Sequence, residues 1–136
     1  MSYALSPALQ RAIFARLKAD PTLIGLTGGT IFDSYPAGEV PPLYVALGPE
    51  RVRDRSDKTG YAAQHDLTIS VVTREPGFAI AKDVAAAVSD ALVDAALPLS
   101  RGHLVGLRFL RANAARTGTN DTRRIDLIFR ALVSGA

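Results

Sequence analysis

The chain has 136 residues, a formal net charge of +3 and a hydrophobic fraction of 48%, values that are ordinary for a globular domain with its own core. It has no cysteine, which excludes disulfides and thiolate metal sites. No apolar run approaches the roughly 20 residues that span a bilayer, and the N-terminus lacks a secretory signal pattern. We therefore expect a single domain over residues 1–136, located in the cytoplasm and without membrane contact.

The N-terminal part of the sequence predicts one helix, a short further turn and then two strands. Ser6 and Pro7 form a helix-start signal with Ser6 as the N-cap, and apolar residues at helical spacing predict an amphipathic helix over residues 7–19. Asp20 and Pro21 repeat the signal for a short second turn that ends at Gly28. A short strand is expected over residues 31–35, and a continuous apolar strand over residues 43–47.

The segment 49–60, PERVRDRSDKTG, is highly polar, with seven charged side chains in twelve residues. Such a segment cannot bury enough surface to offset its ordering entropy, and it is long for a connection between neighbouring strands. We predict a long charged loop that reaches a neighbouring subunit or another protein. The alternative is a solvated loop without a partner. The interface residues proposed here are Arg51, Arg53, Asp54, Arg55, Asp57 and Lys58.

The C-terminal half predicts a strand, the longest helix and two further strands. Alternation over residues 67–72 indicates a strand, and an apolar stripe over residues 78–97 indicates a helix that covers the sheet. In the next strand, Val105, Leu107 and Phe109 are expected to face one way, with Arg108 and Arg111 on alternate sides. Residues 113–121 connect it to the last strand. The apolar face of that strand comprises Ile125, Leu127, Phe129, Ala131 and Val133, opposite Arg124, Asp126, Ile128 and Arg130.

This order of elements predicts an α+β fold. We expect a mostly antiparallel sheet of about four to five strands, covered by two helices, with the long charged loop between strands.

The sequence predicts no catalytic, cofactor-binding or metal site, and the protein is not expected to be an enzyme. His65 and Asp66 are adjacent on a strand, so their side chains point to opposite faces and cannot act together. Gly28 and Gly29 lack the lysine and hydroxyl of a phosphate-binding loop. The helical carboxylates of Asp83, Asp90 and Asp94 are interpreted as a solvated face.

Residues 101–136 contain seven arginines against Asp121 and Asp126. Arginines in this number can neutralise a phosphate backbone. However, Phe109 and Phe129, the aromatic residues nearby, are expected on the core face, which argues against stacking of bases. Charge-guided subunit docking explains these arginines equally well. The candidate interface residues are Arg108, Arg111, Arg123, Arg124 and Arg130.

Several segments resemble a known family when they are taken together. They are PPLYVALG at 41–48, SDKT at 56–59, HDLTISVV at 65–72, the helix at 79–97, LVGLRF at 104–109 and TRRIDL at 122–127. Their order and spacing are similar to those of the tail-completion, or tail terminator, proteins of long-tailed bacteriophages, prophages and gene transfer agents. The sequence is most similar to the gene-transfer-agent branch, over nearly the whole chain.

The resemblance implies a tail terminator. Such proteins form a homo-oligomeric, six-fold ring that ends polymerisation of the tail tube. The ring contacts the tail-tube protein on one side and the head–tail connector or stopper on the other, and DNA passes through without specific binding. The protein would assemble in the cytoplasm and then belong to the particle. Two alternatives stay open: another head–tail connector, such as a stopper or adaptor, and a nucleic-acid-binding module that uses the arginine-rich C-terminal hairpin.

Overall fold

The computed structural model describes residues 3–117 and 122–135. In chain order the described elements are α1 (Ser6–Ala19), α2 (Pro21–Thr27), β1 (Ile31–Phe32), β2 (Leu43–Asp54), β3 (Ala62–Thr73), α3 (Ala79–Leu92), β4 (His103–Thr117) and β5 (Thr122–Ser134).

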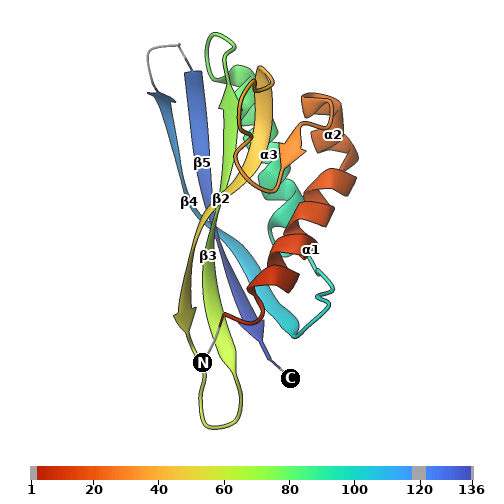
Figure 1. The fold of residues 1–136 in the computed structure, drawn as a ribbon, viewed down its shortest axis with the longest axis vertical. Coiled ribbons are helices and arrows are strands. Elements are labelled where there is room, and N and C mark those ends of the chain that lie inside the picture. Colours follow the sequence, from red (N-terminus) through yellow and green to blue (C-terminus); the bar gives the residue numbers. More distant parts are fainter. Residues whose placement is uncertain (1–2, 118–121, 136) are drawn as a thin grey trace.

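The five described strands form one sheet in the order β1-β2-β3-β5-β4. Only β1 and β2 pair in parallel, and the other neighbours are antiparallel. The sheet is strongly twisted. In Figure 1, β4 and β5 lie to the left of β2 and β3 at the top of the view and to their right at the bottom. The helices lie on one face of the sheet. The predicted α+β fold with a mostly antiparallel sheet is therefore confirmed, with three described helices in place of the expected two.

The core lies between the helices and the sheet face that they cover. On α3, Val84, Val88 and Leu92 are fully buried, as the apolar stripe predicts. Fully burying one such side chain stabilises the fold by roughly 1.5–3 kcal/mol. The helix ends at Leu92, five residues before the predicted end at 97, because the chain turns extended at Val93. The other large, fully buried side chains include Leu9, Ile13, Leu17, Leu23, Val45, Ile69, Val71, Leu107 and Phe129.

One predicted helix start is confirmed and one is wrong. The Asp20 side chain accepts a hydrogen bond from the backbone N–H of Leu23 at 3.0 Å, and Gly28 ends α2 with a φ of 72°. In α1, by contrast, the N-cap is Leu5 and no side chain caps the helix. The Ser6 hydroxyl instead contacts Glu50, at 3.0 Å. The Ser6 hydroxyl, which the capping pattern predicts to bond the start of the helix, thus donates to the Glu50 carboxylate, 44 residues away in the sequence.

The predicted long loop over residues 49–60 is wrong, because β2 continues to Asp54 and β3 starts at Ala62. The charged half of β2 pairs with β3 through Arg51 opposite Asp66 and Arg53 opposite Gln64. Backbone pairing and cross-strand partners compensate for the polarity that suggested a loop. The remaining turn is short, and the Asp57 carboxylate orders it by accepting backbone N–H bonds at 2.8 and 3.1 Å.

The predicted connection over residues 113–121 is also shorter than expected. Residues 113–117 belong to β4, where they pair with residues 122–126 of β5. The rest of that connection, residues 118–121, lies outside the described residues.

Three bulges change which way the side chains face. One lies between Leu47 and Glu50 of β2, and two lie in β4, between Leu104 and Gly106 and between Phe109 and Arg111. Each adds a residue to one strand and so shifts the period-two alternation.

The bulges in β4 overturn two predictions about facing. Arg108 pairs with Arg130 and Arg111 pairs with Ile128, two residues apart on β5, so both arginines lie on the same face. The predicted common face of Val105, Leu107 and Phe109 is confirmed for Leu107 and Phe109, which pair with the inward-facing Ala131 and Phe129, and is wrong for Val105. Val105 is the extra residue of its bulge and is 62% exposed, whereas Leu107 is 2% exposed. Phe109 is 43% exposed, so it does not lie in the core as expected.

Within residues 3–117 and 122–135, no helix combines the length and the apolar character that crossing a membrane requires.

Candidate protein interface on the open face of the sheet

The face of the sheet turned away from the helices, called the open face below, gathers arginines from three strands. Strand register places Arg51, Asp66, Arg130 and Arg108 side by side in one row across β2, β3, β5 and β4. The rows on either side add Arg53 and Arg111, and a row farther along the same face adds Arg124. These come from distant parts of the chain and are assembled by the strand order.

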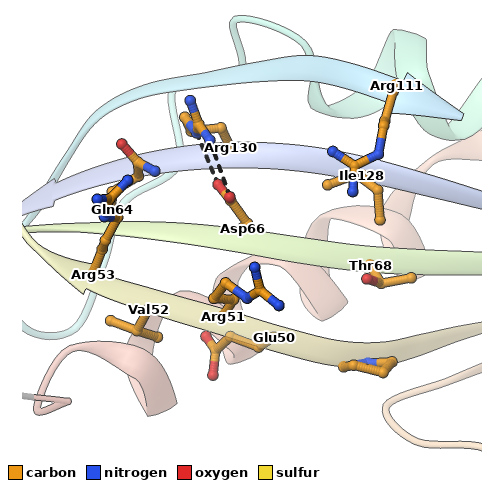
Figure 2. Close-up of a pocket in the computed structure, with 11 residues that line it drawn as sticks. Glu50, Arg51, Val52, Arg53, Gln64, Asp66, Thr68, Arg111, Ile128 and Arg130 are labelled. Carbon is orange, nitrogen blue, oxygen red and sulfur yellow. Dashed lines mark hydrogen bonds and ion pairs between the residues drawn. The ribbon is translucent and has the colours of Figure 1, made fainter.

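Asp66 and Arg130 form the centre of this arrangement (Figure 2). Nε and Nη2 of Arg130 donate to the two carboxylate oxygens of Asp66 at 2.8 and 3.0 Å. This two-point hydrogen bonding lowers the pKa of Asp66, and the nearby charges of Arg130, Arg111 and Arg51 lower it further. Asp66 therefore stays ionised and neutralises one arginine of the open face.

Four other arginines of the open face lack such a partner. Within the described part of the chain, no hydrogen bond or ion pair reaches the guanidinium groups of Arg51, Arg53, Arg108 and Arg111. All four are exposed. Guanidinium groups are rigid forks that match carboxylates, so this set of free donors suits an acidic protein surface.

The open face is hollowed where these arginines lie. A groove of about 750 Å³ runs between β2 and β4 and is lined in part by Arg51, Asp66, Arg111 and Ile128. A second hollow of about 520 Å³ adjoins it and shares Gln64 and Arg130. The second hollow is lined by Arg55, Ala62, Gln64, Asp94, Val105, Gly106, Leu107, Arg108, Arg130 and Leu132. A charged, concave surface is thus available for a convex partner.

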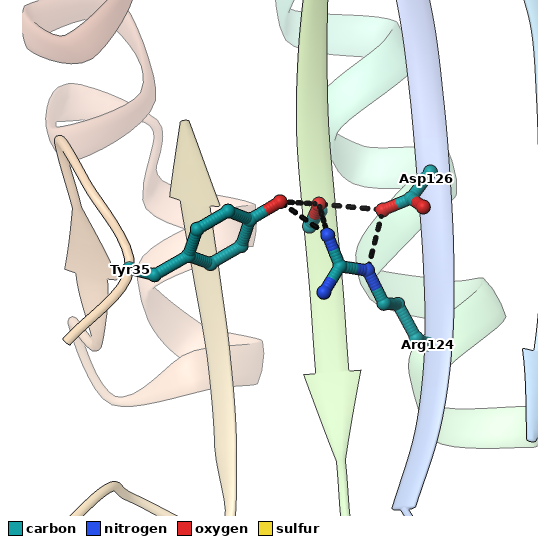
Figure 3. Close-up of polar contacts among 4 residues, drawn as sticks. Tyr35, Arg124 and Asp126 are labelled. Carbon is teal, nitrogen blue, oxygen red and sulfur yellow. Dashed lines mark hydrogen bonds and ion pairs between the residues drawn. The ribbon is translucent and has the colours of Figure 1, made fainter. Parts of the chain in front are cut away.

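Tyr35 covers the opposite end of the open face (Figure 3). Its hydroxyl lies 2.8 Å from the Ser70 hydroxyl and accepts a hydrogen bond from Arg124. The Arg124 guanidinium lies 4.8 Å from the centre of the Tyr35 ring, and its Nε donates to Asp126 at 2.8 Å. Gly48 makes room for the ring, since a Cβ there would lie 2.7 Å from the Tyr35 hydroxyl. This end of the face is closed by the chain's own contacts.

A separate polar cluster lies on the helix side, around Glu50. Its carboxylate accepts hydrogen bonds from His65 Nδ1 at 2.9 Å, from Ser6 and from Tyr3. Burial raises the pKa of Glu50, but these hydrogen bonds outweigh burial and the pKa is lowered overall. His65 is fully buried here while Asp66 lies on the open face, so the prediction that they point apart is confirmed. Among the described residues, no group of three or more acidic or histidine side chains could hold a metal ion.

The predicted interface residues are only partly brought together. Arg51, Arg53, Arg108, Arg111, Arg124 and Arg130 share the open face, and Arg55 lines the second hollow. Asp54 pairs with Ala63 and so belongs to the helix-side face, while Asp57 and Lys58 occupy the turn. Arg123 pairs with Thr73 and lies 5.7 Å from the Phe78 ring, away from the others.

Sequence reasoning missed Asp66 and Tyr35 as members of this surface. The cross-strand partner of Asp66 is Arg130, 64 residues away. Tyr35 reaches Arg124 from 89 residues away. For Asp66, strand alternation could have indicated the correct face, because pairing β3 with β5 places Asp66 opposite Arg130.

Comparison with protein families and solved structures then identifies the family. Residues 11–134 match the family model described as tail completion protein gp17. The chain belongs to this family. A solved chain from the virion of a native gene transfer agent particle is 57% identical, with a TM-score of 0.93, and the match covers 98% of this chain and 100% of that one. The expected resemblance to tail-completion proteins, including the gene-transfer-agent branch, is therefore confirmed.

A second solved structure shows how far the fold extends beyond close relatives of this tail completion protein. It is 15% identical and has a TM-score of 0.51, with coverage of 100% of this chain and 97% of the other, so the likeness concerns the fold alone. Comparison with curated proteins gave no match.

Proposed function

We propose that this tail completion protein is a structural component of a gene-transfer-agent or phage-like particle and acts as its tail terminator. Copies of the chain form a six-fold ring that ends polymerisation of the tail tube and joins the tail to the head connector, with DNA passing through the ring. The protein acts through its interfaces and not through catalysis. It assembles in the cytoplasm and becomes part of the particle.

The similarity to a chain of a native gene transfer agent virion carries this proposal. A TM-score of 0.93 over 98% of this chain means that the strands, helices and hairpins of the two proteins correspond throughout. At 57% identity, surfaces as well as core are expected to be shared. The polar and concave open face agrees with a protein that functions by docking.

We propose that the open face and the β2–β3 hairpin are the contact surfaces. The end of this hairpin extends beyond the helices, so both of its sides are available to a neighbour (Figure 1). Its turn carries Arg55, Asp57 and Lys58, all in positions that the helices do not cover. The tail-tube protein and the head connector are the expected partners at the two ends of the ring, and neighbouring copies are the partners within it.

Particle assembly without the protein tests the terminator role. Cells that lack this chain should yield full heads without joined tails, together with free tails of irregular length, as seen by negative-stain electron microscopy. A cryo-EM reconstruction of complete particles should place a ring of this chain at the head-proximal end of the tail tube. Its location at the distal tip, or tails of normal length and attachment without it, would contradict the proposal.

Two alternatives are separated by the same experiments and one further measurement. Another connector role, as a stopper or adaptor, would place the chain between the tail ring and the portal in the reconstruction. The exposed arginines of the open face favour nucleic-acid binding as the other alternative. It requires duplex or single-stranded DNA to bind the isolated protein with an affinity that falls steeply as salt rises. Substitution of Arg108 and Arg111 by alanine would then reduce that salt dependence.

A further inference from the structure

Helix α3 exposes a stripe with two carboxylates on the outside of the helix layer. Asp83, Ala86 and Asp90 are all exposed and follow one another at intervals of three and four residues, which places them along one side of the helix. The two carboxylates are about 10 Å apart along the axis, since an α-helix rises 1.5 Å per residue. The small side chain of Ala86 between them allows another surface to approach the helix closely.

This stripe and the open face lie on opposite sides of the molecule. α3 packs on the covered face of the sheet through Val84, Val88 and Leu92, whereas the arginines project from the other face. A closed ring of identical copies needs a heterologous contact, in which one patch meets a different patch on the next copy. Two complementary patches on opposite sides of one chain satisfy that requirement.

Within the described helices, α3 is the one whose exposed side carries carboxylates. Its one exposed cation, Lys82, lies 5.9 Å from the centre of the Phe78 ring, at the start of the helix. The exposed side of α1 carries Arg11, Arg16 and Lys18 and would repel the open face. The stripe of α3 carries carboxylates that can accept the free donors of Arg51, Arg53, Arg108 and Arg111. The shapes also agree, because a helix is convex and the open face is grooved.

We propose that α3 of one copy docks into the open face of the next copy. In this contact Asp83 and Asp90 face the arginine group that includes Arg108 and Arg111, and Ala86 lies over the floor of the groove near Ile128. Repetition of the contact in one direction generates the ring. This inference rests on the proposed ring function and names the two surfaces that build it.

Charge reversal tests the contact. The variants are R108E/R111E on the open face, D83K/D90K on α3 and, as a matched control, R11E/K18E on α1. Self-association is measured by sedimentation velocity at low salt over increasing concentration, with circular dichroism as a check on folding. Each of the first two variants should lose association by at least tenfold, and the control should keep it.

Mixing the two defective variants gives a sharper result. In a mixed ring, the glutamates on the open face of R108E/R111E meet the lysines on α3 of D83K/D90K. The unchanged arginines on the open face of D83K/D90K meet the unchanged aspartates on α3 of R108E/R111E. An equimolar mixture should therefore regain association as an alternating ring, and so should one chain that carries all four substitutions. If the wild type associates under these conditions, failure of both to recover would overturn the proposal; if the wild type stays monomeric, the crosslinking experiment below decides.

Crosslinking in assembled particles tests the same contact where a tube or connector is present. The chain has no cysteine, so A86C/N113C introduces the only two thiols while leaving the charges in place. These positions lie on opposite sides of the sheet, so a short bismaleimide can join them only between copies. A covalent ladder of this chain up to the ring size is expected, whereas A86C or N113C alone should give no ladder.

The outcomes separate the docking proposal from the terminator proposal. Complete particles that contain the ring but give no ladder, or in which the thiol introduced by N113C is joined to the tail-tube protein, would overturn the docking proposal while the terminator role stands. Absence of any ring of this chain at the head-proximal end would contradict the terminator role itself. A ladder that forms in particles establishes the α3–open-face contact even where the isolated protein stays monomeric.

Discussion

The carboxylate of Glu50 on β2 and the Nδ1 atom of His65 on β3 lie 2.9 Å apart on the helix side of the sheet. The next residue of each strand, Arg51 and Asp66, lies on the open face. His65 is fully buried and Glu50 is 13% exposed. The bulge between Leu47 and Glu50 turns this carboxylate inward, where it also fixes Ser6 at the start of α1. One polar side chain thereby ties the charged end of β2 to β3 and to α1.

Removal of this carboxylate should destabilise the protein. We expect Glu50→Ala to lower the free energy of unfolding by about 1–3 kcal/mol, because the buried Nδ1–H of His65 loses its acceptor. Glu50→Gln keeps an acceptor oxygen and should cost less. Urea denaturation monitored by circular dichroism measures both. Glu75→Ala, which changes an exposed glutamate two residues after β3, is the matched control, and equal effects of the two alanine variants would contradict this role.

Stability should fall in mild acid, and two carboxylates should account for part of the fall. The pKa values of Asp66 and Glu50 are lowered from ordinary values of 3.8 and 4.5. As the pH falls, the unfolded chain therefore binds protons at these groups before the folded chain does. Their stabilising contribution is present above the ordinary pKa values and is lost progressively between about pH 5 and pH 2.

The variants that check this pH dependence are Asp66→Asn and Glu50→Gln. Each should show a smaller loss of unfolding free energy across that range than the wild type, measured by urea denaturation at successive pH values. Asp83→Asn on α3 is the control and should follow the wild-type curve, because its carboxylate has no hydrogen-bond or ion-pair partner among the described residues. Parallel curves for all the variants would refute the assignment.

Glycine should be required at position 48 because the Tyr35 ring occupies the space of a side chain there. Glycine to alanine within a strand ordinarily stabilises a protein by roughly 0.5–1 kcal/mol. Here the added Cβ would lie 2.7 Å from the Tyr35 hydroxyl and 3.3 Å from Cζ. We therefore expect Gly48→Ala to destabilise by about 1 kcal/mol, at the lower end of overpacking costs, as the ring is displaced from Ser70 and Arg124. In a Tyr35→Ala background the same change should be neutral or stabilising, which a double-mutant cycle measures.

Two neighbouring phenylalanines should differ greatly in their contributions. Phe129 is fully buried and Phe109, whose ring centre lies 5.9 Å away, is 43% exposed at the edge strand. Phe129→Ala should cost about 3–5 kcal/mol in thermal or urea unfolding, as expected for a large side chain in a core. Phe109→Ala should cost far less, because much of its surface is already in water. Similar losses for the two variants would argue against the different burial described above.

The regular elements could be predicted from the sequence because local pattern and final burial agree there. The alternation in β5 predicted both faces correctly, with Phe129 inward and Arg130 outward. The stripe of α3 likewise predicted which side is buried. The alternation of β5 is not shifted, because the extra residues of the β4–β5 bulges lie on β4 and the pairing of β5 with β3 is regular.

The charged half of β2 could not be predicted in the same way. Its polarity is typical of a loop. In the structure, however, Glu50 has a hydrogen-bond partner in His65 on the helix side of the sheet, and Arg51 lies opposite Asp66 on the open face. Both partners are distant in the sequence, so local composition does not contain them. The open face was missed as a unit for a related reason, since a bulge of one residue places Arg111 beside Arg108 against the strand period.

The bulge in β4 also determines where this chain tolerates a change in length. Leu110 is the residue without a partner on β5, between the pairs Phe109–Phe129 and Arg111–Ile128. Its deletion would leave a regular ladder with every later side chain on its present face. Deletion of Ala112, two positions on, could be absorbed only by closing the bulge, which would pair Leu110 with Ile128 and turn Arg111 toward the helices. Deletion of Leu110 thus shortens β4 and keeps the arginines on the open face, whereas deletion of Ala112 removes Arg111 from it.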